Sequence, residues 1–110
     1  MVPVISNARP QMIYYIDVDD TLIRTVGNIV IPIIDTVNWA KGVDLTKNIL
    51  YLWSRGGADY AKGIAAKLGI SELFTAFLSK PDTLIDDQDI KDWSHLRVHH
   101  PSSLPIYDVA

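Results

Sequence analysis

Runs of apolar residues alternate with amphipathic segments along the chain, and this alternation predicts a small α/β fold. The runs Met12–Ile16 and Ile49–Trp53 are almost continuously apolar, as is typical of buried strands in a parallel sheet. Shorter apolar runs predict three further strands, at Phe74–Leu78, Thr83–Ile85 and Leu96–His99. Because strands separated by helices favour parallel pairing, the pattern indicates one continuous sheet.

Two segments between these runs have the periodicity of amphipathic helices. The first is predicted to begin at Pro32 and to end at Gly42, with apolar residues at helical spacing at Ile33, Ile34, Val37 and Ala40. The second is closed by Gly69, and its apolar face consists of Ala58, Ala61, Ile64, Ala65 and Leu68. The expected fold is a small doubly wound, Rossmann-like parallel sheet of about five strands with helices on both faces.

Three other segments have a simpler interpretation. Gly27-Asn28, between short β-branched runs in Leu22–Ile31, predicts a tight turn and a small hairpin flap. Gln88–Trp93 predicts a single helical turn. Residues 1–110 are expected to form one domain, with extended arms at 1–11 and 101–110.

Composition narrows the classes of protein that the chain can belong to. Hydrophobic residues make up 48%, enough for a packed core, and the net charge of −3 disfavours broad nucleic-acid binding. The chain has no cysteine, which excludes a disulfide, a thiolate metal site and a cysteine nucleophile. No apolar stretch is long enough to span a bilayer and no signal peptide is evident, so we expect a soluble cytoplasmic protein.

Polar residues follow four of the apolar runs, and their types are chemically complementary. They are Asp17, Asp19 and Thr21, then Ser54, then Lys80, then Asp86 and Asp87. Because ligands bind at the carboxyl ends of the strands in an open α/β sheet, these side chains are expected to converge on one edge. Carboxylates suit Mg²⁺, and a hydroxyl and an ammonium suit phosphoryl oxygens. A remaining carboxylate can act as a nucleophile or an acid.

These four motifs, in this order between Met12 and Asp87, resemble those of the haloacid dehalogenase (HAD) superfamily of phosphohydrolases. Asp17-Val18-Asp19-Asp20-Thr21 is similar to the family's DxDxT motif. Ser54 and Lys80 correspond to its second and third motifs, and the pair Asp86-Asp87 corresponds to the fourth. The resemblance implies a Mg²⁺-dependent phosphomonoester hydrolase.

The resemblance also implies a role for each motif residue. Asp17 would be the nucleophile that forms an aspartyl-phosphate, and Asp19 the general acid and base. Ser54 and Lys80 would bind the phosphoryl group, and Thr21 would orient the loop. The ligands of Mg²⁺ would be Asp17, the backbone carbonyl of Asp19, Asp86 and, directly or through water, Asp87.

Both intervals in which the family carries a cap domain are short here, so the chain resembles a capless member. Such members act on bulky phosphoesters or borrow a cap from a second subunit. The expected partners are a phosphorylated substrate, with a nucleotide or an end-phosphorylated nucleic acid among the candidates, and a homo-oligomer that covers the site. Arg24 and Arg55 are candidates for binding the leaving group or a second phosphate, or are simply surface arginines.

Plainer interpretations exist for each motif. The Asp17–Thr21 segment and the Asp86-Asp87 pair could be turns or helix caps, Ser54 could cap the next helix, and Lys80 could be an exposed lysine. His95, His99 and His100 show no metal-ligand spacing, and Trp39, Trp53 and Trp93 are expected to serve packing.

Two other functions fit the same residue types. One is a phospho-acceptor domain of the response-regulator type, although such receivers place the acidic pair first and the phosphorylated aspartate later, the reverse of the order here. The other is a non-catalytic binding domain that keeps the HAD-like fold, although such a domain would be expected to have lost a motif residue.

Overall fold

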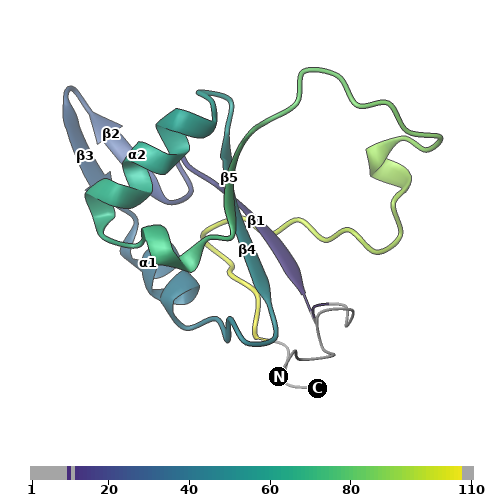
Figure 1. The fold of residues 1–110 in the computed structure, drawn as a ribbon, viewed down its shortest axis with the longest axis horizontal. Helices are drawn as coiled ribbons and strands as arrows, with labels where there is room; N and C mark the ends of the chain where they lie inside the picture. The colour runs from purple at the N-terminus through teal and green to yellow at the C-terminus, as the bar shows by residue number, and fades with distance from the viewer. Residues whose placement is uncertain (1–9, 11, 108–110) are drawn as a thin grey trace, which may run out of the picture.

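The computed structural model describes residue 10 and residues 12–107, and its centre is a three-stranded parallel sheet (Figure 1). The strands are β1 (Ile13–Asp17), β4 (Ile49–Ser54) and β5 (Ala76–Ser79), in the spatial order β1-β4-β5. All three overlap apolar runs that predict strands, and β4, the longest, lies in the middle. The structure therefore confirms a small α/β fold built on a parallel sheet.

A two-stranded antiparallel hairpin confirms the predicted flap. It consists of β2 (Ile23–Val26) and β3 (Ile29–Pro32), and Gly27 adopts the positive φ of 61° that its turn requires. The start of the next helix differs from the prediction, because Pro32 is the last residue of β3 and α1 begins at Ile34. Pro32 lacks an amide hydrogen, and a two-stranded ribbon tolerates this at a strand end.

Both helices, α1 (Ile34–Lys41) and α2 (Ala58–Leu68), contribute to a single core on one face of the sheet. This core contains Ile16, Leu50 and Leu52 from the strands, Val37 and Ala40 from α1, and Ala61, Ile64 and Ala65 from α2. As predicted, the helices end at Gly42 and at Gly69, whose φ is 70°. The arrangement differs from the expected helices on both faces.

In the described part of the chain, no helix covers the opposite face of the sheet. Ile13 and Tyr15 on β1 alternate with the core residues and are each 49% exposed. The ring of Tyr15 contacts those of Tyr51 and Trp53, at centroid separations of 5.1 and 4.8 Å. The aromatic side chains on this face therefore cover one another in place of a third helix.

The segment between Lys80 and residue 100 loops out from the body (Figure 1) and contains no strand. The predictions of strands at Thr83–Ile85 and Leu96–His99 are therefore wrong. Local hydrogen bonds of Asp86 and Asp89 to the amides two residues ahead favour turns instead of a sheet ladder. The only regular piece in this segment is the 3₁₀ turn Ile90–Asp92, which lies inside the predicted helical turn.

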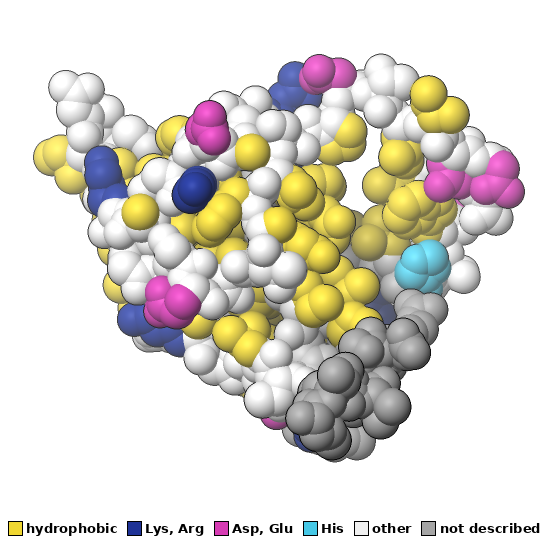
Figure 2. All heavy atoms as spheres, viewed as in Figure 1, with side chains coloured by type: hydrophobic (Ala, Val, Ile, Leu, Met, Phe, Trp, Pro, Cys, Tyr) yellow, Lys and Arg dark blue, Asp and Glu magenta, His cyan; other side chains and the backbone are white. Residues whose placement is uncertain are grey.

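Hydrophobic side chains of this outer segment remain in water. Ile85 is 95% exposed and Val98 is 89% exposed. Figure 2 shows hydrophobic side chains on both sides of a hollow between the body and the outer segment. The outer segment and the uncovered sheet face therefore both present apolar surface to solvent.

The chain returns to the body through contacts with Trp39 on α1. The indole nitrogen of Trp39 donates to the carbonyl of Pro105 at 2.8 Å, and the hydroxyl of Tyr107 donates to the Trp39 carbonyl. The rings of Trp39 and Tyr107 stack, and that of Trp39 also meets the Tyr14 ring edge-on at 4.9 Å. The predicted packing role of Trp39 is confirmed.

Of the predicted arms, residues 1–9, 11 and 108–110 lie outside the described residues. No helix in the described part of the chain is long and apolar enough to cross a membrane.

Candidate active site

The loop that follows β1 is shaped by Val18. Its side chain is fully buried, and its carbonyl oxygen accepts the amides of Thr21, Leu22 and Ile23 at 3.3, 2.9 and 3.1 Å. Asp20 reverses the chain with a φ of 62°, a region that aspartate tolerates better than most residues. The alternation around Val18 leaves the carboxylates of Asp17 and Asp19 free to face the edge of the sheet.

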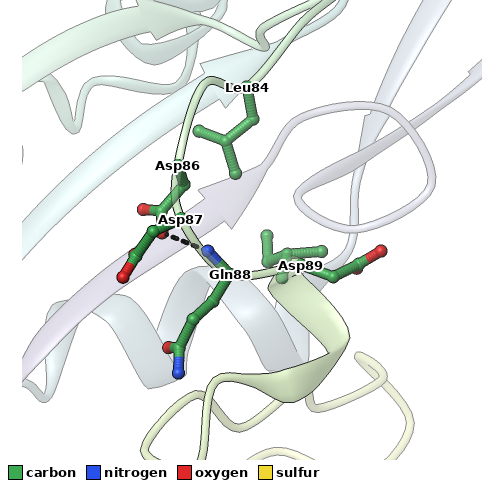
Figure 3. A pocket seen from close by; sticks show the side chains of 6 residues that line it. Leu84, Asp86, Asp87, Gln88 and Asp89 are labelled. Carbon is green, nitrogen blue, oxygen red and sulfur yellow. Dashed lines mark hydrogen bonds between the residues drawn. The ribbon is translucent and has the colours of Figure 1, made fainter.

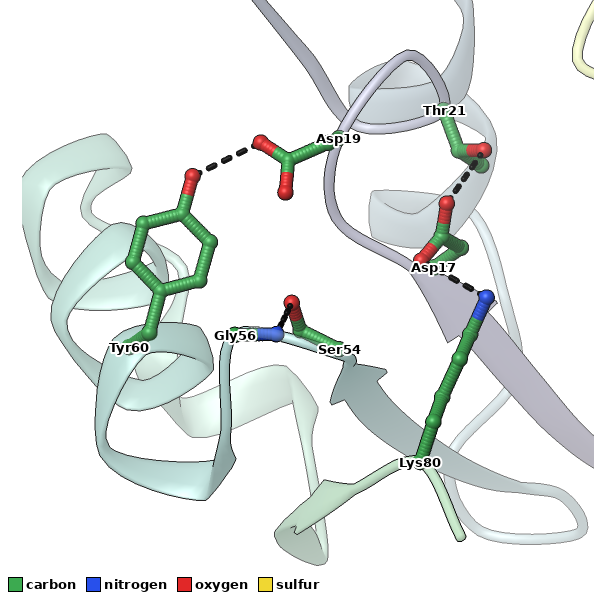
Figure 4. A network of polar contacts seen from close by, with 7 residues as sticks. All are labelled: Asp17, Asp19, Thr21, Ser54, Gly56, Tyr60 and Lys80. Carbon is green, nitrogen blue, oxygen red and sulfur yellow. Dashed lines mark hydrogen bonds and ion pairs between the residues drawn. The ribbon is translucent and has the colours of Figure 1, made fainter. Parts of the chain in front are cut away.

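Asp17 is held by two of the predicted site residues (Figure 4). The ammonium group of Lys80 lies 3.1 Å from its Oδ1, and the hydroxyl of Thr21 donates to its Oδ2 at 3.3 Å. The side chains of Asp17 and Lys80 are 31% and 30% exposed, so the pair is within reach of solvent and ligands. The structure thus brings the first and third motifs together, as expected for strand ends in one sheet.

Lys80 is fixed at both of its ends. Its backbone amide donates to the carbonyl of Ser54 at 2.9 Å, which continues the pairing of β5 with β4. Its ammonium group lies 5.6 Å from the centroid of the Trp53 ring, in cation–π contact. Trp53 therefore packs as predicted and also supports the lysine.

Ser54 ends the central strand and is 1% exposed. Its hydroxyl oxygen accepts the amide of Gly56 at 2.9 Å and shapes the turn after β4 (Figure 4). The plainer interpretation of Ser54 as the cap of α2 is wrong, since Gly57 is the N-cap and the Ala58 amide donates to Ser79 Oγ at 3.0 Å. The Ser54 hydroxyl hydrogen can donate in addition to this turn contact.

Asp19 has a partner that the sequence analysis missed. The hydroxyl of Tyr60 on α2 donates to Asp19 Oδ1 at 2.7 Å. This hydrogen bond, followed by partial burial, raises the pKa of Tyr60 to about 12. Tyr60 is not among the residues that the helical pattern places on the apolar face of α2, and only the two glycines just before the helix hint that a side chain packs closely there.

The structure does not bring Asp86 and Asp87 to the other carboxylates. Asp86 accepts the amide of Gln88 at 2.9 Å, and this bond is the main reason that its pKa is lowered. Asp86, Asp87 and Leu84 line an open hollow on the outer segment (Figure 3), whose lining includes no residue of the first three motifs. Within residues 12–107, no three acidic or histidine side chains form a group that could hold a metal ion.

The weaker candidates remain at the periphery. Arg24 on β2 and Arg55 in the turn after β4 are exposed, and neither forms an ion pair with a described carboxylate. His95 stacks on Trp93, and His100 contacts the hydroxyl of Ser102. These histidines serve local packing and turn formation.

Comparisons of this chain with protein-family models, curated proteins and solved structures give no significant match. The geometry of the site therefore carries the functional argument.

Proposed function

We propose that this protein is a HAD-type phosphohydrolase that cleaves a phosphomonoester through an aspartyl-phosphate on Asp17. The observation that carries the proposal is the 3.1 Å ion pair between Asp17 and Lys80 at the carboxyl ends of parallel strands. A carboxylate repels a phosphate dianion, by on the order of 4 kcal/mol per charge pair at about 4 Å and a dielectric near 20. A cation beside the nucleophile is therefore a requirement of this chemistry.

In the proposed reaction a carboxylate oxygen of Asp17 forms a bond to phosphorus as the bond to the ester oxygen breaks. Asp19 gives a proton to the departing oxygen and later removes one from the water that hydrolyses the aspartyl-phosphate. Lys80 and the Ser54 hydroxyl bind phosphoryl oxygens, and Thr21 keeps the Asp17 carboxylate in one rotamer through its 3.3 Å hydrogen bond.

Mg²⁺ belongs to the proposal, and it would supply positive charge to the phosphoryl group. The described structure brings together only part of the expected ligand set. Asp17 and the Asp19 carbonyl lie at and just after the end of β1, whereas Asp86 and Asp87 lie on the outer segment. Their recruitment would require the outer segment to move toward β1.

Two features leave room for that rearrangement. The outer edge of β1 has no strand beside it in the described structure, and the sheet face that bears Tyr15 is uncovered. The outer segment has its own exposed apolar residues to bury, including Ile85. Both surfaces would lose contact with water if the segment docked there.

The proposed substrate is a bulky phosphoester, with a nucleotide or an end-phosphorylated nucleic acid as candidates. The described chain has no cap over the site beyond the β2–β3 hairpin. Val26 and Ile29 near the hairpin turn are 56% and 64% exposed. This apolar tip could contact a substrate or a second subunit that covers the site.

The test is hydrolysis of an aryl phosphate with and without Mg²⁺ by the parent and by Asp17→Asn. Turnover that needs Mg²⁺ and disappears in Asp17→Asn is expected, while Asp35→Asn on α1 should keep parental activity. An Asp17→Asn variant as active as the parent would contradict the proposal.

The separation of Asp86 from Asp17 favours one alternative, a phospho-acceptor or binding domain without turnover. Incubation with acetyl phosphate followed by mass spectrometry distinguishes the two. A long-lived phosphoryl group on Asp17, with no release of phosphate from a broad panel of esters, would support the alternative.

A further inference from the structure

Tyr60 joins the first turn of α2 to the loop after β1. Its hydroxyl donates to Asp19 Oδ1 at 2.7 Å, across 41 positions of sequence. The side chain is 36% exposed, so the contact lies at the mouth of the site and not in the core. Figure 4 shows the tyrosine on one side of Asp19, with the Asp17–Lys80 pair on the other.

Gly56 allows the Tyr60 ring to lie against the turn after β4. A Cβ atom at Gly56 would come within 2.8 Å of Tyr60 Cδ2 and 3.3 Å of Ser54 Oγ. The ring is therefore in close contact with the same turn that Ser54 shapes. Tyr60 thus contacts both the turn that Ser54 shapes and the carboxylate of Asp19.

The hydrogen bond uses one oxygen of the Asp19 carboxyl group and leaves the other available. Figure 4 shows this second oxygen on the side of Ser54. The phenol is the donor of this bond, because an ionised carboxylate can only accept. A carboxyl group fixed at one oxygen has its rotation restricted, and its free oxygen is aimed.

We propose that Tyr60 is a positioning residue of this site, which orients the carboxyl group of Asp19 for proton transfer to the leaving oxygen. This inference rests on the proposed phosphohydrolase function. Tyr60 does not need to touch the phosphoryl group for this role, because it acts through Asp19.

The role predicts a dependence on the leaving group. An aryl oxygen departs with little help from an acid, whereas an alkyl oxygen needs the proton. Loss of the Tyr60 hydroxyl should therefore slow alkyl phosphates more than aryl phosphates. A residue that merely supported the fold would slow both equally.

The experiment measures kcat and KM of the parent, Tyr60→Phe and Tyr51→Phe on p-nitrophenyl phosphate and on an alkyl phosphate. For Tyr60→Phe we expect kcat to fall about tenfold on the alkyl ester, less than that on the aryl ester, with KM little changed. Tyr51→Phe, on the uncovered face, should match the parent. An equal change in kcat on both esters, or no change, would overturn the positioning role of Tyr60. The proposed phosphohydrolase function would still stand in that case, provided that the parent protein turns over the esters.

A readout without turnover separates the two proposals. The side-chain carboxyl ¹³C resonance of Asp19, assigned with Asp19→Asn, should move in Tyr60→Phe and not in Tyr51→Phe. If the parent hydrolyses no ester, the phosphohydrolase proposal fails on its own. An Asp19 resonance that is unaffected by Tyr60→Phe overturns the positioning role whatever the activity.

Discussion

The side chain of Lys80 crosses the end of the central strand to reach Asp17, so the ion pair joins the last residue of β1 to the residue that follows β5. The ammonium group lies 3.1 Å from Asp17 Oδ1 and 5.6 Å from the centroid of the Trp53 ring. Trp53 lies on the central strand, where it is paired with Asp17. The backbone of Lys80 is meanwhile bonded to Ser54. This lysine therefore depends on the register of all three strands.

Lys80→Met should reduce turnover far more than it reduces stability. The expected loss in kcat is about 100-fold, since the proposed reaction would lose the positive charge that binds the phosphoryl group. The free energy of unfolding should change by at most about 1 kcal/mol, because the ion pair is partly exposed. Urea denaturation and steady-state kinetics measure the two effects, with Lys62→Met on the exposed side of α2 as the control. A loss of stability that accounts for the lost activity would contradict this division.

Gly56 and Gly63 form a matched pair for substitution by alanine. Gly56→Ala forces the Tyr60 ring away and should destabilise the protein by about 1–2 kcal/mol. Gly63 lies inside α2 with nothing within 4 Å of a built Cβ, so Gly63→Ala should stabilise by about 0.5–1 kcal/mol. Thermal denaturation of both variants checks the signs, and two variants that shift in the same direction would count against the close packing at Gly56.

The raised pKa of Tyr60 predicts a loss of stability in alkali. Because the pKa is about 12 in the folded protein and 10.0 for a free tyrosine, the contribution of the neutral hydroxyl is complete below pH 10. It is lost as the pH rises through about 12. The free energy of unfolding should therefore fall more steeply across this window in the parent than in Tyr60→Phe, and parallel curves would refute the prediction.

Ser79 supplies a cap to a helix that follows another strand. Its hydroxyl oxygen accepts the Ala58 amide at the start of α2, where the helix has no side-chain cap of its own. Ser79→Ala should cost about 0.5–1 kcal/mol of the free energy of unfolding. Ser103→Ala, outside the helices, is the control, and an equal effect of the two changes in urea denaturation would argue against the cap.

Asp20 tests the shape of the loop after β1. Its φ of 62° is costly for most side chains with a Cβ and least so for asparagine and aspartate. Asp20→Asn should leave stability nearly unchanged, whereas Asp20→Val should cost about 1–2 kcal/mol. Circular dichroism during heating compares the two, and equal stability would mean that the turn relaxes to another conformation.

The sequence was a good guide where the chemistry follows the sheet. Asp17 and Ser54 come directly after apolar runs and Lys80 comes two residues after one, and parallel strands bring such positions to one edge. The hydrophobic pattern also predicted the parallel strands, the hairpin and the ends of both helices. In each of these cases a short stretch of sequence, such as an apolar run or a glycine at a turn, is enough to determine the local structure.

The failures arise where the outcome depends on distant contacts. Tyr60 was missed because a helical pattern shows which face is polar but not what that face approaches. Thr83–Ile85 is apolar enough for a strand, yet three residues gain little from pairing, and Asp86 has a nearby amide to accept. The uncovered sheet face has the same origin, since the almost continuously apolar run of β1 favours burial on both sides but does not show whether a helix covers each side.

Val18 gives the proposed catalytic loop an inner anchor, with its side chain in the core and its carbonyl bound by three amides. A loop fastened in this way has little freedom to loosen while the core remains intact. Thermal inactivation and melting of the protein should therefore coincide, so that residual activity after heating counts the surviving folded molecules. Val18 thus couples the proposed activity to the folded core, although it would take no part in bond-making or proton transfer itself.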